Sequence, residues 1–282
     1  MIKTKDYSTG ECDLHLHTIV SDGEMTPADI LTCAKSLNLR TISITDHDAV
    51  GAYIHFGDII QQAEEMGLSL IPGIELDSYY EEVEIHVLGY GIDIHHEELN
   101  RYLSYVHSLR RQRIKEQMVK INRYYNKELI KEEEIFIPSR DTLMNPHLVH
   151  LLLRHGLFSG YKEAARWISA NAKSSVTVPK PSTAEMINLV KKAGGRAFMA
   201  HPGYYIFESG LNIDKMIQDL QPVGLDGMET EFPYLGTGSK FQTRESVREV
   251  IESFKRVAHE YGLAVSRGSD AHTVPQMTAF NT

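Results

Sequence analysis

Cysteine and long apolar segments are both scarce in this chain of 282 residues. The two cysteines, Cys12 and Cys33, lie in patterns typical of a buried strand and a buried helix, which excludes a disulfide framework. No stretch has the roughly 20 continuous apolar residues that cross a bilayer, and the first residues lack the apolar core of a signal peptide. We therefore expect a cytoplasmic protein that does not bind a membrane.

Positive charge is also in short supply. The chain has 29 lysines and arginines against 38 aspartates and glutamates, for a net charge of -9. This balance excludes a broad basic face, so duplex DNA is not an expected partner and any anionic substrate must be attracted locally. No pattern indicates an oligomeric state.

The hydrophobic pattern predicts an α/β protein. Apolar runs with strand character alternate with amphipathic helices, which favours parallel strand-helix-strand units in a closed or nearly closed barrel. The expected strands are residues 11–15, 41–45, 68–76, 83–90, 196–200, 225–228 and 263–267. The expected helices of this part are residues 27–37, 52–66, a segment from Ser182, and residues 214–220 and 244–261. The predicted fold is a distorted TIM-like (β/α)7 barrel.

The pattern changes in residues 95–180, which interrupt the barrel. Helices are expected at 97–125, 146–155 and 161–172, with an acidic run between the first two. A segment of this length is too long for a plain loop, so we expect a barrel domain of residues 1–94 and 181–282 with an all-helical insertion. Its ends leave and rejoin between ligand-bearing strands, which favours a lid over the active site rather than a stabilising appendage.

Histidine is abundant, with 14 residues, and the histidines gather at the ends of the expected strands. His15 and His17 are two residues apart at the end of the first strand, so both side chains point to the same side. Alone, each of these histidines also fits a buried, hydrogen-bonded role. The other ligand-type residues at strand ends or within strands are His47, Glu75, His86, His201, Asp270 and His272.

Such groups converge at the C-terminal mouth of a barrel, where a cluster of carboxylates repels itself unless cations are bound. Imidazole and carboxylate ligands without thiolate suit Mn²⁺, Fe²⁺ or Zn²⁺. The sequence therefore predicts a site for divalent transition metals.

Five motifs together resemble the PHP (polymerase and histidinol phosphatase) family of metal-dependent phosphoesterases. They are DLHLHTIVSDGEMTPADIL, TDHDAVGAY, GIEL, AHPG and GSDAH, and they span residues 13–272. The resemblance implies two or three metal ions. One is held by His15, His17, Glu75 and Asp270, a second by Glu75, His86 and His201, and a third by Asp22, His47 and His272. Asp22 enters through the resemblance alone, because Ser21-Asp22-Gly23 also fits an ordinary turn.

The motifs most resemble a subgroup that acts on nucleotide 3′,5′-bisphosphates and on the 5′ ends of short oligoribonucleotides. That subgroup usually carries an Arg-Pro-His element, whereas this chain has Asn145-Pro146-His147. Arg140 or Lys180 could replace the missing phosphate-binding arginine, or both could be ordinary surface groups. Tyr204 could stack on a base or merely pack in the core.

The expected chemistry is hydrolysis of a small phosphomonoester by a metal-bridging hydroxide, which requires no side-chain nucleophile. The sequence does not identify a general acid. Three alternatives stay open: a histidinol-phosphate phosphatase, a metal-dependent amide or lactone hydrolase, and a non-catalytic metal-binding PHP module. Because every expected ligand position is filled, the non-catalytic module is the least favoured.

Overall fold

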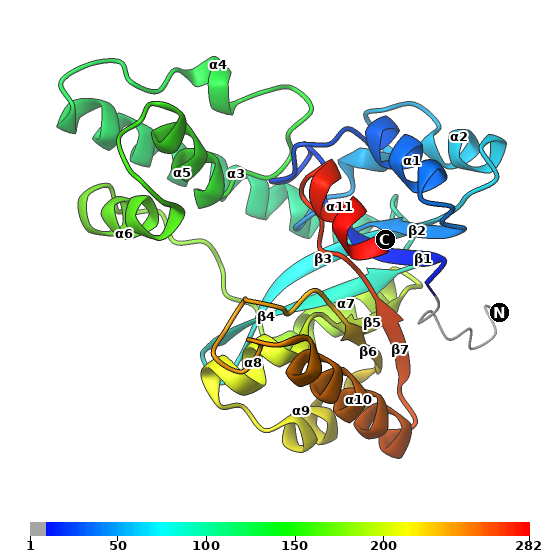
Figure 1. Ribbon diagram of the computed structural model, residues 1–282. Helices are drawn as coiled ribbons and strands as arrows, with labels where there is room; N and C mark the ends of the chain where they lie inside the picture. The colour runs from blue at the N-terminus through cyan, green and yellow to red at the C-terminus, as the bar shows by residue number, and fades with distance from the viewer. Residues whose placement is uncertain (1–9) are drawn as a thin grey trace.

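A seven-stranded sheet forms the centre of the computed structural model, which describes residues 10–282 (Figure 1). The strands lie side by side in chain order, from β1 to β7. Their bounds are β1 Cys12–Leu16, β2 Thr41–Ile44, β3 Ser69–Tyr80, β4 Val83–Tyr90, β5 Arg196–Met199, β6 Leu225–Glu231 and β7 Ala264–Arg267. All seven expected strands are therefore present.

One strand departs from the expected parallel arrangement. β4 runs antiparallel to both β3 and β5, whereas the other neighbouring strands are parallel. β3 continues to Tyr80, four residues past its expected end, and only Glu81 and Glu82 separate it from β4. Both residues have positive φ, 48° and 66°, as in a two-residue hairpin turn. Such a short connection permits only antiparallel pairing, so the parallel units expected from the sequence do not include β4.

The sheet curls until its first and last strands meet. Leu16 forms a parallel bridge with Ala271, and the His17 amide donates a 3.0 Å hydrogen bond to the Ala271 carbonyl. Leu14 of β1 also packs in one buried cluster with Leu88 of β4 and Phe198 of β5. Since these strands are far apart in the strand order, the contact crosses the interior of the curled sheet. The expected TIM-like architecture is thus confirmed as a curled seven-stranded sheet with helices around it.

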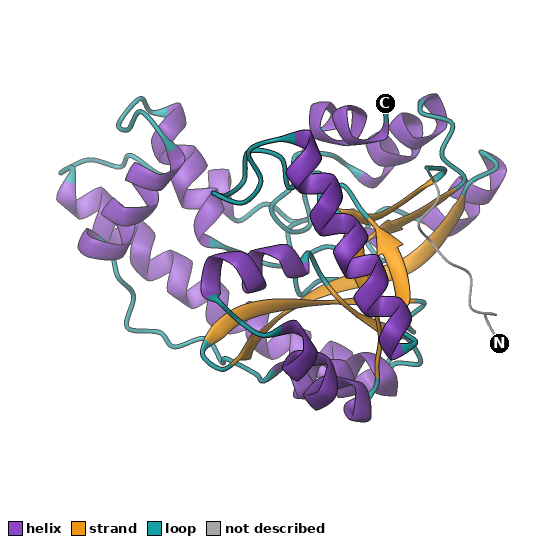
Figure 2. Ribbon diagram, turned by 60° about the horizontal axis from the view of Figure 1, so that its bottom comes forward, coloured by secondary structure: helices purple, strands orange, loops and turns teal. Residues whose placement is uncertain are grey.

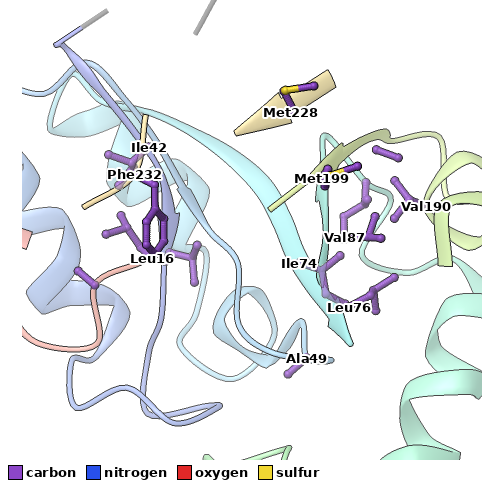
Figure 3. Close-up of a cluster of buried hydrophobic side chains, with 14 of the residues drawn as sticks. Leu16, Ile42, Ala49, Ile74, Leu76, Val87, Val190, Met199, Met228 and Phe232 are labelled. Carbon is purple, nitrogen blue, oxygen red and sulfur yellow. The ribbon is translucent and has the colours of Figure 1, made fainter. Parts of the chain in front are cut away.

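Helices cover the sheet, as Figure 2 shows. The main buried core lies between the strands and these helices, and its members include Ile42, Ile74, Val87 and Met199 (Figure 3). The helices outside residues 95–180 are α1 Pro27–Ser36, α2 Ile59–Glu65, α7 Thr183–Lys192, α8 Pro202–Ser209, α9 Ile213–Leu220, α10 Arg244–Tyr261 and α11 Val274–Asn281. Among the described residues, none of these or the other helices combines the length and apolar character needed to cross a bilayer.

The helix expected at residues 52–66 is present only in its second half, and it ends before Gly67 as expected. A 3-10 turn, η1 Gly51–Tyr53, comes first, and α2 begins only at Ile59. The Tyr53 hydroxyl is buried against the sheet, where it donates to the Ile44 carbonyl at 2.6 Å and accepts from the Gly73 amide at 2.9 Å. Gly57 then turns the chain at φ 72°, so tertiary contacts override the helical periodicity. A second 3-10 turn, η2 Gln221–Val223, precedes β6.

Residues between β4 and α7 form helices that extend away from the sheet (Figure 1). The helices are α3 Glu97–Tyr124, α4 Glu132–Ile135, α5 Asn145–Arg154 and α6 Tyr161–Asn171. Leu99 and Leu103, in the first turns of α3, pack into the main core. The second half of α3 packs with α5 and α6 around a separate buried cluster that includes Ile121 and Leu148. We call residues 97–180 the helical segment.

Candidate metal centre

The nine predicted metal ligands come together at one end of the curled sheet. His15 lies on β1, Glu75 on β3 and His86 on β4, while the others lie in the loops that follow strands. The loop after β1 carries His17 and Asp22, the loop after β2 carries His47, the segment after β5 carries His201, and the loop after β7 carries Asp270 and His272.

Glu75 is the centre of this cluster and is 1% exposed. Its Oε2 atom lies 3.0 Å from His15 Nε2 and 3.2 Å from His17 Nε2. Its Oε1 atom lies 2.9 Å from His86 Nδ1 and 3.3 Å from His201 Nε2. One carboxylate therefore faces two groups of imidazoles at once, the arrangement required of a ligand that bridges two cations.

Four overlapping sets of side chains have ligand atoms close enough together to hold one ion. Three of the sets contain the residues of the three predicted groups. They are His15, His17, Glu75 and Asp270; Glu75, His86 and His201; and His17, Asp22, His47 and His272. His17 joins the third set as well as the first. The fourth set, His47, Asp77 and His86, contains a carboxylate that sequence reasoning missed.

Unsatisfied polar atoms in the cluster fit bound cations. His17 Nε2 and Asp22 Oδ1 are buried and lie 3.2 Å from Glu75 Oε2 and His272 Nε2, respectively, yet neither atom makes a contact with hydrogen-bond geometry among the described residues. Buried polar atoms normally have hydrogen-bond partners, so these two atoms indicate a missing ligand. The donors are imidazole nitrogens and carboxylate oxygens, which suit a divalent transition metal. The residues present therefore fit the metal ions that the sequence implies.

Several histidines are also held by groups behind them. His15 Nδ1 lies 3.1 Å from Glu229 Oε1, His47 Nδ1 lies 3.1 Å from Asp77 Oδ1, and His201 Nδ1 lies 3.1 Å from the Tyr205 hydroxyl. Such partners fix the ring and its tautomer and leave the other nitrogen free to bind a metal.

Two of these partners carried a signal in the sequence. Glu229 directly follows the expected strand 225–228, in the kind of position that marked the other ligands. Asp77 is two residues after Glu75 on the same strand, so both side chains project to the same face. Tyr205 had no comparable signal, because its role depends on α8 packing against β4, where the Tyr205 hydroxyl accepts a 2.9 Å hydrogen bond from the His86 amide.

The backbone is strained beside the cluster. His201, Asp270 and Asp48 have positive φ values of 27°, 50° and 44°, a conformation that non-glycine residues rarely adopt. Such strain persists only where the surrounding structure enforces it, and it concentrates at functional sites. Gly268 is equally constrained, because a Cβ atom there would lie 2.2 Å from His15 Cβ and 2.5 Å from Glu229 Oε1.

The carboxylates and imidazoles shift one another's pKa values. Burial alone would lower the pKa of His47, but the charges of Glu75 and Asp22 outweigh it and raise the pKa to about 9. Burial alone would raise the pKa of Asp22, but His272 and His47 hold it well below its usual range. In the absence of cations His47 is therefore protonated and Asp22 ionised at neutral pH, and a bound cation must displace the proton of His47.

The three predicted substrate-binding residues line three different cavities. Arg140 and Asp22 line a cavity of about 530 Å³, whereas Lys180 and Asn145 line another of about 310 Å³. Tyr204 and Asp270 line a third, of about 450 Å³. Arg140 and Lys180 thus approach the cluster from separate sides, since Asp22 belongs to the first cavity and Asp77 to the second.

Comparison with known proteins agrees with this geometry. The model of the PHP domain matches residues 13–176, more than half of the chain. The chain belongs to the PHP family and is a metal-dependent phosphoesterase.

Individual relatives match almost the whole chain. It is 28% identical over 273 residues to the 5′-3′ exoribonuclease Rnm of Escherichia coli, covering 92% of this chain and 84% of that protein. It is 24% identical over 261 residues to the 3′,5′-nucleoside bisphosphate phosphatase of Chromobacterium violaceum, covering 92% and 86%. A solved structure from Bifidobacterium adolescentis, assigned as a metal-dependent phosphoesterase, is 28% identical with a TM-score of 0.76, covering 95% of this chain and 90% of that one.

Proposed function

We propose that this enzyme hydrolyses phosphomonoesters of nucleotides, either 3′,5′-bisphosphates or the 5′ ends of short oligonucleotides. The observation that carries the proposal is the convergence of His15, His17, His47 and the other predicted ligands around Glu75. The names of the relatives, an exoribonuclease and a nucleoside bisphosphate phosphatase, support a nucleotide substrate.

In this proposal two or three divalent ions, Mn²⁺, Fe²⁺ or Zn²⁺, are held by the nine predicted ligands. Bound cations supply positive charge to the phosphate oxygens and lower the pKa of a water molecule at the site toward neutrality. The side chains hold and orient the site: Glu75 separates the ligand groups, and Glu229, Asp77 and Tyr205 fix the rings of His15, His47 and His201. No serine or cysteine nucleophile is needed.

Charge is distributed unevenly along the chain in a way that favours an extended anionic substrate. The helical segment, residues 97–180, contains 15 lysines and arginines against 9 acidic residues. Its formal charge is +6, so the rest of the chain carries -15. Arg113 and Lys180 line one cavity beside the cluster, and Arg140 and Arg154 line another. We propose that the helical segment acts as a lid whose cations bind a second phosphate of the substrate.

The cavity beside Asp270 suits the base of a nucleotide. Tyr204, Phe232 and Phe280 line it, and aromatic rings bind bases by stacking. His201 also lies within ring contact of both Tyr204 and Phe232, at centroid distances of 5.3 and 5.1 Å. A base in this cavity would therefore lie beside the metal ligands.

A substrate panel tests the proposal. Protein stripped of metal and reloaded with Mn²⁺, Fe²⁺ or Zn²⁺ is assayed for phosphate release from 3′,5′-bisphosphorylated nucleotides, 5′-phosphorylated oligoribonucleotides and histidinol phosphate, and for hydrolysis of amide and lactone substrates. We expect nucleotide hydrolysis that stops with chelator and returns with metal. Faster hydrolysis of histidinol phosphate, or of an amide or lactone, would replace the proposed substrate class. Failure to hydrolyse any phosphomonoester would refute the proposal.

A further inference from the structure

Arg110 joins the helical segment to the metal centre. It lies on α3, is 7% exposed, and forms an ion pair with Asp48 and a 2.8 Å ion pair with Asp77 Oδ2. Its other terminal nitrogen donates to the Thr142 hydroxyl at 3.0 Å. Both terminal nitrogens of the guanidinium are therefore bound, one by the carboxylates of Asp48 and Asp77 and the other by the hydroxyl of Thr142 in the helical segment.

The two carboxylates are part of the site's framework. Asp48 directly follows the predicted ligand His47, its amide donates to the Glu75 carbonyl at 2.7 Å, and its backbone has a φ of 44°. Asp77 Oδ1 lies 3.1 Å from His47 Nδ1, on the opposite side of its carboxylate from Arg110. The contacts thus form a chain from α3 through Arg110 and Asp77 to His47.

The two carboxylates explain why a guanidinium is needed at this place, because both are largely buried against Arg110 and a buried carboxylate requires a paired cation. His47 Nδ1 is held by Asp77 at 3.1 Å and lies 3.4 Å from Glu75 Oε2, so Nε2 is the ring atom that is left to bind a metal.

We infer that Arg110 is a positioning residue, which orients His47 through Asp77 and so makes metal binding depend on the docking of the helical segment. The inference rests on the proposed metal site, but it does not depend on which substrate the enzyme hydrolyses. Arginine suits this role because its planar fork can bond two carboxylates at once, whereas lysine presents a single point charge.

Metal binding, measured without substrate, tests the inference. Arg110→Met, Arg110→Lys and Asp77→Asn are stripped of metal and titrated with Mn²⁺ by calorimetry, and bound metal is counted by elemental analysis. We expect the affinity of one bound ion to fall about 10- to 100-fold in each variant, the range found when partners behind a metal ligand are removed. Arg101→Met is the matched control, because Arg101 lies on the same helix, is exposed and pairs only with Glu97 among the described residues.

A double variant separates positioning from folding. Arg110→Met leaves two neighbouring buried carboxylates without a cation, which is expected to destabilise the protein. Asp48→Asn combined with Arg110→Met removes one of these charges, so the melting temperature should recover while the metal affinity stays low. Wild-type affinity and stoichiometry in Arg110→Met, or recovery of affinity in the double variant, would overturn the inference. Loss of one bound ion in Asp77→Asn, with all ions retained in Arg110→Lys, would show that Asp77 is itself a metal ligand. That result would also contradict the positioning role of Arg110.

Activity then distinguishes this inference from the proposed function. If the wild type hydrolyses nucleotides, Arg110→Met should lower kcat at saturating substrate and recover part of it at high Mn²⁺, with KM nearly unchanged. If the wild type binds Mn²⁺ but hydrolyses no phosphomonoester, the proposed function fails while the metal titrations still decide the role of Arg110.

Discussion

Glu229 holds His15 from behind: its Oε1 atom lies 3.1 Å from His15 Nδ1, and both side chains are completely buried. The other oxygen of Glu229 accepts a 3.0 Å hydrogen bond from the His201 amide. One carboxylate on β6 thereby fixes a ligand on β1 and the backbone of another ligand after β5. The position of the predicted metal ligands consequently depends on this neighbouring carboxylate as well as on the ligands' own strands and loops.

Replacing Glu229 with glutamine should weaken metal binding. The amide keeps the size of the side chain but loses the charge that orients and polarises His15, so we expect a loss of about 10- to 100-fold in affinity for Mn²⁺. Calorimetric titration of stripped protein measures it. Glu231→Gln is the control, because Glu231 lies on the same strand but pairs with Lys255 at 2.7 Å. Equal affinities in the two variants would show that Glu229 does not support the site.

Gly268→Ala should damage both stability and metal binding. The new methyl group would lie within 2.5 Å of His15 Cβ and Glu229 Oε1, and neither neighbour can move without disturbing the cluster. Overpacking of this kind costs about 1–3 kcal/mol of the free energy of unfolding. Denaturant unfolding measures the loss, with Gly10→Ala as control because none of the residues that the structure describes lies within 4 Å of a Cβ there. Unchanged stability and metal affinity would contradict the close packing.

Metal binding and stability should depend on pH in opposite directions. The pKa of His47 is about 9 in the metal-free fold and near 6.5 in an unfolded chain. Its contribution to the free energy of unfolding is therefore fully present below pH 6.5 and is lost as the pH rises through 9. A metal requires the neutral ring, so its affinity rises over the same window.

Thermal unfolding between pH 6.5 and 8.5 tests this pair of trends. As the pH rises across this range, the melting temperature of metal-free protein should fall. The increase in melting temperature that Mn²⁺ causes should become larger. His47→Gln is the comparison, because it lacks the titrating ring and should show a flatter dependence in the metal-free state. An increase from Mn²⁺ that is the same at every pH would refute the prediction.

Arg140 and Lys180 should affect different contacts of the substrate, because they line separate cavities. A charge-assisted hydrogen bond to phosphate contributes about 1.5–3 kcal/mol, so removing the cation that binds the second phosphate should raise KM for a 3′,5′-bisphosphate at least tenfold. Arg140→Met, Lys180→Met and the exposed control Arg166→Met are compared on bisphosphates and monophosphates.

The variant that lacks the cation bound to the second phosphate should raise KM for the bisphosphate far more than KM for the monophosphate. Equal changes for both substrates would mean that neither cation binds a second phosphate. Asn145→Arg adds a complementary test, because Asn145 lines the Lys180 cavity and a guanidinium there should tighten bisphosphate binding if that cavity receives phosphate.

The sequence by itself determined the strands and the nine candidate ligands. Strand periodicity places His15 and His17 on one side, and residues that end neighbouring strands must meet because the strands share an edge. Both inferences need only local pattern and one rule of barrel geometry, except for Asp22, which the family resemblance alone identified. The same rule extended to Glu229 and Asp77 would have placed them in the cluster as well.

Tertiary structure alone decided what depends on long-range packing. Local periodicity reports which side of a strand is buried but not the direction of its neighbours. The reversed direction of β4 was therefore visible only once the structure showed the two-residue turn at Glu81 and Glu82. The bonds from Arg110 to Asp48 and Asp77 join residues from separate parts of the chain, and only the docking of α3 against the sheet creates them. The separation of Arg140 from Lys180 likewise depends on how the helical segment folds over the sheet.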